Sequence, residues 1–534
     1  MKITSILSKI VLFVLSVMIF SNYLKAQPNI QHSIYFKEKI CTDSFLARPI
    51  FTVQHSKGSC FMAYRTTDQD STAAYSDGVH FAKFDSNWDT VFTKVFNGRW
   101  NETVNFINEL PNGNLLISGY TESADGGIMF SNILGRFIWM LEVDTLGNFI
   151  KAKTFGSGAC ELTDLTITSD GYILLAGNSN ANQYDFTHVV LGSGDAAWIA
   201  KYDTAFNKIW IRVMDGSGED GWTTIKEISP EKYIIGFMSN GMDPASVPAE
   251  AIGKLDLIVH CIDSAANIIW KHRYGSVEHD GSRLSVVDPI TKDIYFVGYN
   301  EWSATGTVTY ASGTCWIQKI DTLGNNKGSK SYGAATDVTF RTDAIWYNDK
   351  LWILAYSNGG GADMEPETNP QNNNAWIGVI DTNVNLVAKY TLVTADVDFL
   401  SDAFFFNNDL YINGLIASYV NPYKCDTNNI TGIILNVGLS PLGINEISNN
   451  IEDAFTLYPN PTKNLLSVKI LEKYIGEDGV LEVYDIQGKL IYKNINKHLD
   501  AQYQIECEKW QIGTYTVKLS INNTKKSTKQ FIKY

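Results

Sequence analysis

The sequence predicts an all-β protein with two domains, and two observations carry that prediction. The first is a repeat of about 60 residues in which short strands of alternating polarity are separated by turn residues. The second is a change after residue 438, where a polar linker leads into another set of short strands. At 534 residues the chain is too long for one ordinary core, so a ring of repeats followed by a small domain is expected.

An aspartate at the end of one strand measures the period of the repeat. It recurs, in steps of 59, 59, 60, 58 and 60 residues, as Asp85, Asp144, Asp203, Asp263, Asp321 and Asp381. A spacing this regular indicates a repeat architecture. The repeats also share an opening sequence such as WIAKYDTAFNKIW, from Trp198 to Trp210, in which an apolar strand, an Asp-Thr turn and a second strand follow one another.

The strand pattern predicts four-stranded antiparallel units. After the opening and second strands, a third strand starts near Leu162 in one repeat, the Asp170-Gly171 turn reverses the chain, and YILLAGNS forms the fourth. A variable stretch of about a dozen residues is then expected to cross to the next unit. This sequence of blade and crossover is typical of a β-propeller.

Partial repeats at the two ends predict seven blades. The segment Ile34 to Thr67 has the pattern of later strands without an opening strand, whereas Thr431 to Val437 has the pattern of an opening strand alone. An open fan would leave an unpaired edge strand at each end, so we expect these segments to pair. The prediction is a seven-bladed β-propeller over residues 27–438, closed by its N- and C-terminal strands.

The repeat resembles that of large exported bacterial propeller proteins. It shares their opening W-I-x-K-x-D strand, their N-x-x-W strand and a YG turn with a following acidic residue, as at Tyr274-Gly275 and Tyr332-Gly333. The resemblance implies the fold and says little about function, because propellers host many unrelated activities.

The N-terminus has the features of a secretory signal peptide, predicted to cover residues 1–26. Lys2 and Lys9 precede a short apolar run, Ile10 to Phe20, and Ala26 stands at a plausible cleavage point. The run is short for a membrane span, and no later segment is apolar enough for one.

Residues 439–452 form a predicted linker, and residues 453–534 a predicted immunoglobulin-like β-sandwich. This segment resembles the type A C-terminal sorting domain of the bacterial type IX secretion system. The residues that carry the resemblance are Tyr458, Pro459, Asn460, Pro461, Val483, Tyr484, Asp485, Gly488, Lys489, Gly513, Tyr515, Phe531 and Lys533.

The resemblance implies passage across the outer membrane of a Gram-negative bacterium, with the type IX machinery as the partner of this domain. It also implies removal of the domain, with cleavage around Gly438 to Glu452, and release or attachment to surface lipopolysaccharide. The alternative is an accessory immunoglobulin-like binding domain.

Charge and cysteine content narrow the classes of partner. The formal net charge is −14, and the last 83 residues hold 12 lysines against 10 acidic residues, so the acidic excess lies in the ring. Such a field repels nucleic acid and anionic membrane surfaces. Seven cysteines at irregular spacing form no disulfide framework, and Cys41 with Cys60 is the most plausible bridge.

An acidic residue 16 or 17 positions after each repeat aspartate is the sharpest chemical pattern in the ring. These residues, expected on one face together with the long crossovers, are Glu102, Glu161, Asp220, Asp280, Asp337 and Asp398. A ring of carboxylates could hold a hard cation or a basic ligand. The alternative, which we favour, is that each carboxylate caps its own turn by accepting backbone N–H bonds.

Aromatic residues give a second set of candidates. The opening-strand tryptophans Trp139, Trp198, Trp316 and Trp376 are expected to pack between blades. Candidates for stacking on a ligand are the aromatics of predicted loops, Trp100, Trp222, Trp302, Tyr310 and Tyr184. The alternative, which we favour, is that they pack within their own loops. We expect no cofactor. Calcium is the alternative, at the ring of carboxylates or at Asp215 to Gly221, although the latter segment lacks the glycine and glutamate of an EF-hand loop.

These features favour a secreted or surface-attached binding protein that recognises a glycan or an envelope protein. The sequence contains no G-x-S-x-G, H-E-x-x-H or phosphate-loop motif. The alternative is an exported carbohydrate-active or other hydrolytic enzyme that uses carboxylates at the mouth of the central channel.

Overall fold

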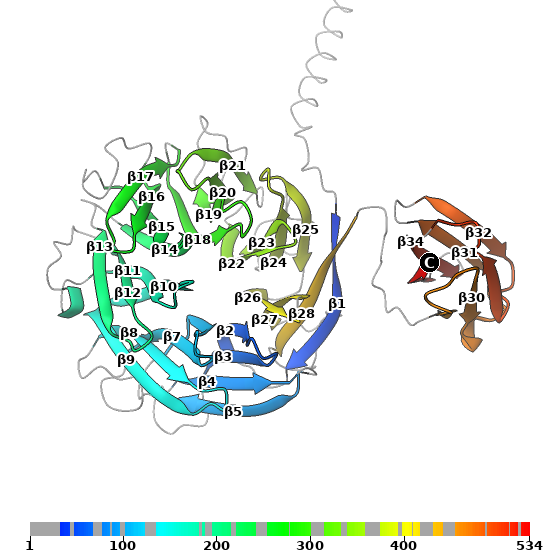
Figure 1. Ribbon diagram of the computed structural model, residues 1–534, viewed down its shortest axis with the longest axis horizontal. Coiled ribbons are helices and arrows are strands. Elements are labelled where there is room, and N and C mark those ends of the chain that lie inside the picture. Colours follow the sequence, from blue (N-terminus) through cyan, green and yellow to red (C-terminus); the bar gives the residue numbers. More distant parts are fainter. Residues whose placement is uncertain are drawn as a thin grey trace, which may run out of the picture. The chain divides into compact units, whose positions relative to one another are not determined.

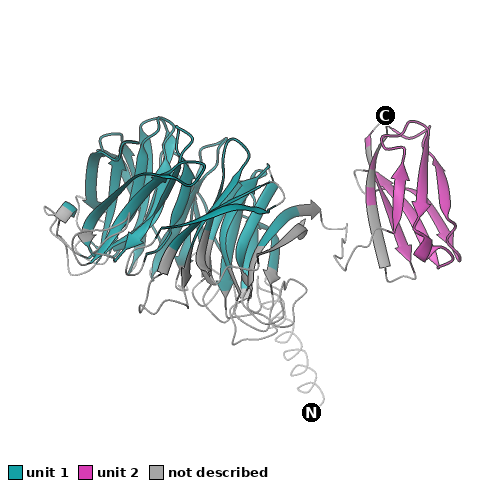
Figure 2. Ribbon diagram, turned by 90° about the horizontal axis from the view of Figure 1, so that it is seen from below, with its two compact units in different colours: residues 1–439 teal, residues 440–534 magenta. Residues whose placement is uncertain are grey.

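The computed structural model divides into two compact units, Met1–Leu439 and Ser440–Tyr534 (Figure 2). The residues that it describes are 32–42, 47–67, 77–85, 88–96, 102–122, 135–180, 184–186, 195–214, 220–241, 254–276, 278–300, 314–332, 339–357, 374–392, 398–407, 409–416, 431–441, 454–485, 489–511, 513–521 and 525–533. The predicted signal peptide and most of the predicted linker lie outside them. Among the described residues, no helix combines the length and apolar character that a membrane span requires.

Unit 1 is built of antiparallel β-sheets, and its described residues form seven of them, each with four strands. Figure 1 shows the sheets side by side around a common centre, with strands such as β10, β22 and β26 nearest the centre and β1 at the outside. Six sheets take their strands in chain order. They are β2 (Ala47–Gln54), β3 (Cys60–Thr67), β4 (Asp77–Phe84) and β5 (Thr90–Phe96); β6 (Phe106–Glu109), β7 (Leu115–Thr121), β8 (Arg136–Val143) and β9 (Phe149–Gly158); β10 (Cys160–Ile167), β11 (Ile173–Ser179), β12 (Ala196–Tyr202) and β13 (Lys208–Met214); β14 (Asp220–Ser229), β15 (Lys232–Ser239), β16 (Asp256–Asp263) and β17 (Ile268–Tyr274); β18 (Asp280–Val287), β19 (Ile294–Asn300), β20 (Thr314–Ile320) and β21 (Asn326–Tyr332); β22 (Thr339–Tyr347), β23 (Lys350–Ser357), β24 (Asn374–Ile380) and β25 (Leu386–Leu392).

The remaining sheet of unit 1 joins the two ends of the chain segment that forms the ring. Its order is β1-β28-β27-β26, from β26 (Asp398–Phe406), β27 (Asp409–Ile416), β28 (Thr431–Pro441) and β1 (His32–Thr42). The segments near Tyr35 and Ile434, which we expected to meet, therefore lie on neighbouring strands. The N-terminal segment contributes fewer strands to this sheet than we expected. The N-terminal segment adds one strand, and β2 and β3 belong to a complete sheet of their own.

The predicted grouping of strands within each unit was wrong by half a repeat. Each sheet contains the two strands that we numbered third and fourth, followed by the opening and second strands of the next repeat, as in β10 to β13. The long variable stretches therefore connect the second and third strands inside a sheet, and short segments cross between sheets. Connection length misled the prediction, because strands of one sheet are usually joined by the shorter loops.

The repeated Asp-x-x-x-Asn sequence closes the hairpin between the third and fourth strands. In the hairpin between β12 and β13, Asp203 Oδ1 accepts the backbone N–H of Asn207 at 2.7 Å and Asp203 Oδ2 accepts its side-chain amide at 2.9 Å. Phe206 between them has a φ of 64°. The same pair of bonds recurs at Asp144, Asp263, Asp321 and Asp381. The sequence therefore repeats this phrase because five of the seven sheets close their last hairpin with the same side-chain bonds.

The core of unit 1 lies between neighbouring sheets. Trp198 of β12 is fully buried against Leu116, Ile138 and Met140 of the preceding sheet. The other opening-strand tryptophans, Trp139, Trp316 and Trp376, are also buried, as expected from their repeated strand position. Opposite Trp198, Gly177 makes room for the indole ring, because a Cβ there would lie 2.6 Å from that ring and 1.9 Å from the Glu161 carbonyl oxygen.

Unit 2 has two antiparallel sheets that share one buried core. One sheet has the order β29-β30-β33 and the other β32-β31-β34-β35. Their strands are β29 (Phe455–Tyr458), β30 (Leu465–Ile470), β31 (Gly479–Asp485), β32 (Leu490–Asn496), β33 (Gln502–Glu506), β34 (Gly513–Ile521) and β35 (Lys525–Lys533). Two single-turn 3-10 helices complete the described elements of the two units, η1 (Tyr184–Phe186) and η2 (Glu472–Tyr474).

Residues that carried the resemblance to a sorting domain meet one another in unit 2. Tyr515 stacks on Phe531 with ring centroids 5.5 Å apart, and its hydroxyl donates to the Gln511 carbonyl. Thr462, which follows the Tyr458 to Pro461 stretch, forms a parallel bridge with Lys533. The predicted bridge between Cys41 and Cys60 is wrong, because Cys60 is a free thiol packed in the core beside Met62 and Ala82.

Candidate functional site

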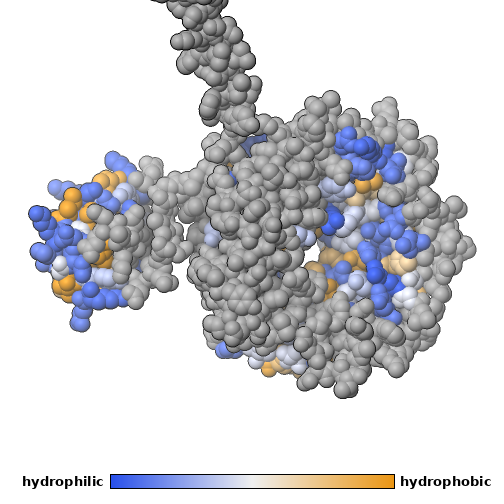
Figure 3. All heavy atoms as spheres, turned by 180° about the vertical axis from the view of Figure 1, so that it is seen from behind, coloured by the Kyte–Doolittle hydropathy of each residue, from blue (hydrophilic) through white to orange (hydrophobic). Residues whose placement is uncertain are grey.

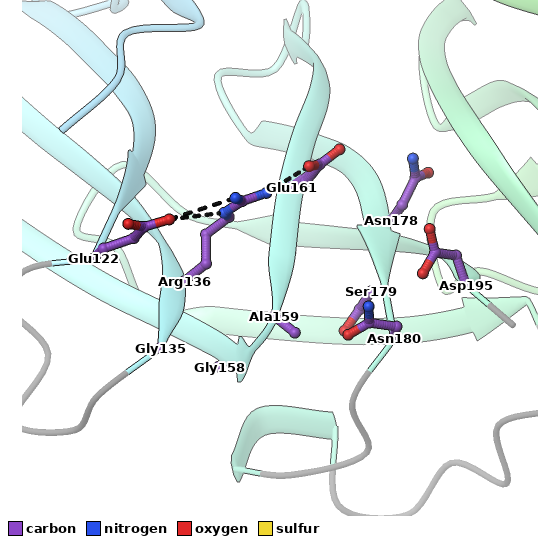
Figure 4. A pocket seen from close by; sticks show the side chains of 10 residues that line it. All are labelled: Glu122, Gly135, Arg136, Gly158, Ala159, Glu161, Asn178, Ser179, Asn180 and Asp195. Atoms are coloured by element: carbon purple, nitrogen blue, oxygen red, sulfur yellow. Dashed lines mark hydrogen bonds and ion pairs between the residues drawn. The ribbon is translucent and has the colours of Figure 1, made fainter. Parts of the chain in front are cut away.

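A pocket of about 530 Å³ lies where the sheet of β6 to β9 meets the sheet of β10 to β13. It is at the end of the sheets that carries the long connections, because β11 ends and β12 begins beside it. Its lining is mostly polar (Figure 4) and consists of Glu122, Gly135, Arg136, Gly158, Ala159, Glu161, Asn178, Ser179, Asn180 and Asp195. We refer to it as the loop-face pocket.

One wall of the loop-face pocket is an arginine held between two carboxylates. Arg136, the first residue of β8, donates from Nη1 to Glu161 Oε1 at 2.6 Å, and its Nε lies 3.4 Å from Glu122 Oε1. Its guanidinium also lies over the Tyr120 ring, 4.6 Å from the ring centroid. These contacts fix the guanidinium plane, although the side chain is still about one-third exposed.

The opposite wall supplies amide, hydroxyl and carboxylate groups from the end of β11 and the start of β12. Asn178 Oδ1 accepts from the Thr223 hydroxyl at 3.2 Å, which orients its amide. Asp195 is exposed, and its backbone carbonyl accepts the N–H of Asp220 at 2.8 Å. With three carboxylates and one guanidinium, the pocket favours neutral, hydroxyl-rich or cationic ligands over anionic ones.

The predicted ring of acidic residues lies at the start of the innermost strands, on the face of the long connections. Glu161, Asp220, Asp280 and Asp398 begin or nearly begin β10, β14, β18 and β26. Their burial differs: Glu102, Asp220 and Asp280 are buried, whereas the Glu161 side chain is 53% exposed. Asp337 and the Asp398 side chain lie outside the described residues. The part of the chain that the structure describes contains no group of three acidic, histidine or cysteine residues arranged to hold a metal.

The contacts of the buried members support a structural role. Asp280 accepts the backbone N–H of Ser276, its own turn, and its N–H donates to the Leu255 carbonyl of the preceding sheet. Burial is the main cause that raises the pKa of Asp280 to about 6. Thr121 donates to Glu102 Oε1 at 3.2 Å. The Asp280 carboxylate therefore caps the turn between β17 and β18, whereas Glu102 bonds within its own sheet, to Thr121 of β7.

A buried arginine lies at the junction that contains Asp280. Arg273 of β17 is 3% exposed, and its Nε lies 3.2 Å from Oδ2 of Asp256, which is fully buried. Arg273 Nη2 also donates to the Ser239 and Gly241 carbonyls. This junction is filled by its ion pair, whereas the one at Arg136 is open.

Most of the predicted stacking aromatics lie outside the described residues, namely Trp100, Trp302 and Tyr310. Tyr184 begins η1. The prediction that Trp222 lies on a loop was wrong, because it is part of β14, at a register shift, with a φ of 52°. The Arg283 guanidinium lies 3.1 Å from the centre of its ring. The candidate calcium segment, Asp215 to Gly221, falls outside the described residues up to Glu219.

Three aspartates on the innermost strands were not among the predicted site residues. Asp164, Asp343 and Asp402 each accept a backbone N–H from the next sheet, donated by Ile225, Ala403 and Thr52 at 2.8, 2.7 and 2.8 Å. Burial is the largest cause that raises the pKa of Asp343, to about 6, and of Asp402. An aspartate that recurs inside an apolar strand after one full period, as at residues 343 and 402, was the signal available.

Comparison with known proteins identifies the C-terminal end of the chain. Residues 456–534 match the family model of the secretion system C-terminal sorting domain. This sorting domain of type IX secretion implies recognition by the type IX machinery and secretion to the cell surface or the extracellular space. No curated protein matches the chain.

Solved structures that resemble the chain are distant from it in sequence. A member of the DUF4221 family from Bacteroides vulgatus is 9% identical, with 77% of this chain and 99% of that chain covered and a TM-score of 0.37. An α-L-arabinanase from Penicillium chrysogenum in complex with arabinobiose is 13% identical (67% and 99% covered, TM-score 0.38). An α-L-arabinofuranosidase from Fusarium graminearum is 10% identical (77% and 98% covered, TM-score 0.34). At these TM-scores none of them bears on what this chain binds.

Proposed function

We propose that this chain is an exported binding protein whose ring recognises a neutral, hydroxyl-rich glycan at the loop-face pocket. The sorting domain at residues 456–534 supports export. In this proposal residues 1–26 direct the chain to the periplasm, the type IX machinery reads the C-terminal domain, and cleavage between Gly438 and Glu452 releases the ring or attaches it to lipopolysaccharide.

The proposal treats unit 1 as a closed seven-bladed β-propeller and unit 2 as an immunoglobulin-like sandwich. The seven four-stranded sheets of the described residues, and the pairing of β1 with β28, support the propeller. Two sheets around one core support the sandwich. Closure matters for function because it fixes neighbouring sheets, and the loop-face pocket is formed by two of them.

The observation that carries glycan recognition is the composition of the loop-face pocket. Its amide, hydroxyl and carboxylate groups can each donate to or accept from sugar hydroxyls, and contacts at Arg136 and Asn178 hold two of the walls in place. Its net negative charge excludes uronic acids and sulfated sugars from the expected ligands. A fixed polar wall lowers the entropic cost of ordering side chains on binding.

A glycan and cell-envelope binding screen of the secreted protein, with and without calcium, tests this proposal. Asp195→Asn and Asn178→Ala should each weaken binding of a captured glycan about tenfold, the loss of one or two hydrogen bonds. Asp349→Asn, on a turn outside the pocket, is the control and should bind as the unmodified chain does. Equal binding by all three variants would show that the ligand binds elsewhere.

Export has its own test. Deletion of residues 455–534 should trap the ring in the periplasm, since the segment that matches the sorting domain is then missing. Fractionation and immunoblotting measure the distribution. Normal amounts of the truncated chain in the medium would contradict the role of the sorting domain and leave the glycan proposal untouched.

The second candidate function is a hydrolytic enzyme that uses carboxylates of the central channel. One observation favours it: Asp343 and Asp402 line the same cavity. Each already has an oxygen engaged by a backbone N–H, which favours the binding interpretation. Release of reducing sugar from a bound polysaccharide, abolished by Asp402→Asn, would establish the enzyme.

A further inference from the structure

A second cavity, of about 410 Å³, lies on the central channel, apart from the loop-face pocket. Its walls come from β2, β6, β22 and β26, and Figure 1 shows β2, β22 and β26 near the centre of unit 1. In Figure 3 hydrophilic and hydrophobic residues meet inside the opening at the centre. The lining residues that matter here are Phe51, Phe106, Phe404, Phe405, Asp343 and Asp402.

Asp343 and Asp402 bring two carboxyl groups into this channel cavity, and burial raises the pKa of both, with repulsion by Asp343 adding to the rise at Asp402. Backbone N–H groups of Ala403 and Thr52 hold one oxygen of each carboxylate. No ion pair to either carboxylate is present among the described residues. Lys226 is the lysine whose charge acts on Asp343. It forms an ion pair with Asp164 at 2.6 Å, so it does not neutralise the two cavity carboxyl groups.

The side-chain amide of Asn413, beside Asp402, has a buried oxygen without a hydrogen-bond partner. Asn413 is fully buried, and its Nδ2 donates to the Thr52 hydroxyl at 2.8 Å and lies 3.4 Å from Asp402 Oδ2. Its Oδ1 has no hydrogen-bond partner in the structure. Asn413 lies behind the cavity lining, but Asn108 is part of it and its buried Oδ1 also has no hydrogen-bond partner. Buried polar atoms are normally paired, so a ligand in the cavity that donates hydrogen bonds would satisfy Asn108.

Four phenyl rings, of Phe51, Phe106, Phe404 and Phe405, are among the residues that line the cavity. Phe51 and Phe106 are partly exposed, with ring centroids 5.9 Å apart, and Phe405 is partly exposed as well. Ring faces attract ammonium groups, and phenyl rings also accommodate the methylene groups of an alkyl chain.

We propose that the channel cavity binds a primary alkylammonium group, with Asp343 and Asp402 as its counter-ions and the phenyl rings around its methylene chain. An amino sugar and the side chain of a lysine both carry this group. The site is independent of glycan recognition at the loop-face pocket, and either proposal can fail without the other.

Calorimetric titration of the full secreted chain with pentane-1,5-diamine and with the matched neutral pentane-1,5-diol tests the proposal. The diamine should bind and the diol should not. Asp343→Asn and Asp402→Asn should each weaken diamine binding at least tenfold, while the asparagine oxygen still accepts the backbone N–H of the next sheet. Phe51→Leu should weaken it about two- to fivefold, since the ring face is lost and the apolar surface is kept.

The double variant Asp164→Asn, Lys226→Gln is the matched control. Asp164 makes the same bond to the next sheet as the cavity aspartates, lies outside the cavity lining, and its pair is removed without a change in net charge. It should bind diamine as the unmodified chain does. Glucosamine and a terminally blocked lysine then distinguish the two sources. No heat with the diamine, equal heat with the diol, or unchanged binding in both aspartate variants would overturn the proposal.

Discussion

Two junctions between neighbouring sheets in unit 1 use an arginine in opposite ways. At the junction of β6–β9 with β10–β13, Arg136 is about one-third exposed and pairs with the exposed Glu161 at the edge of the loop-face pocket. At the junction of β14–β17 with β18–β21, Arg273 is buried and pairs with the buried Asp256. The repeat thus sets where charged residues stand, while their burial decides whether a junction is a pocket or part of the core.

The largest effect on stability is expected at the junction filled by the Arg273–Asp256 ion pair, which we call the closed junction. Asp256→Ala should lower the free energy of unfolding by about 3–5 kcal/mol, because it leaves the buried Arg273 guanidinium without its carboxylate. Denaturant unfolding followed by tryptophan fluorescence measures the change. A loss of less than about 1 kcal/mol would remove the distinction between the junctions.

The closed junction should also depend on pH through Asp280. Because burial raises the pKa of Asp280 to about 6, above its ordinary 3.8, the folded chain holds this proton more tightly than the unfolded chain does. Its contribution to stability is full below the unfolded pKa and is lost as the pH rises through about 6, with an upper limit of about 3 kcal/mol.

Asp280→Asn should therefore flatten the dependence of unfolding free energy on pH between about pH 4 and about pH 7. Stability measured across this range, for the variant and the unmodified chain, decides the matter. The same slope in both proteins would show that another group titrates.

A smaller effect on stability is expected at Gly177, which lies near the junction that forms the loop-face pocket, called here the open junction. Gly177→Ala should cost about 1–3 kcal/mol, since the added methyl group would meet the Glu161 carbonyl and the Trp198 ring. Gly221→Ala is the control, because a Cβ there would meet nothing closer than Asn178 Nδ2 at 3.7 Å. Thermal unfolding compares them, and equal melting temperatures would contradict the tight approach at Gly177.

The smallest effect is expected for the open ion pair itself. Glu161→Gln should change the free energy of unfolding by less than about 1 kcal/mol, since both partners are solvent-accessible and screened. Its effect should appear in ligand binding at the loop-face pocket. A loss of stability as large as that of Asp256→Ala would place both junctions in one class.

Local chemistry made part of this structure predictable from the sequence. The Asp203 to Asn207 turn uses its own side chains, so its residues alone predict it. The prediction of which strands share a sheet was wrong. The sequence of a strand does not specify its hydrogen-bonded neighbours, and here the longest connections lie within a sheet and not between sheets. The burial of Asp280 and the exposure of Glu161 could not be predicted either. Asp280 bonds to Leu255 and Glu161 pairs with Arg136, and both of these partners lie elsewhere in the chain.

The outermost position of β1 ties the beginning of the ring to its end. β1 ends at Thr42, and its partner β28 begins at Thr431, so nearly the whole of unit 1 must be synthesised before this sheet can form. Closing so long a segment has an entropic cost that grows slowly with its length. A chain that has not yet emerged as far as Thr431 retains an unpaired edge strand, and the sorting domain follows soon after that residue in the order of synthesis.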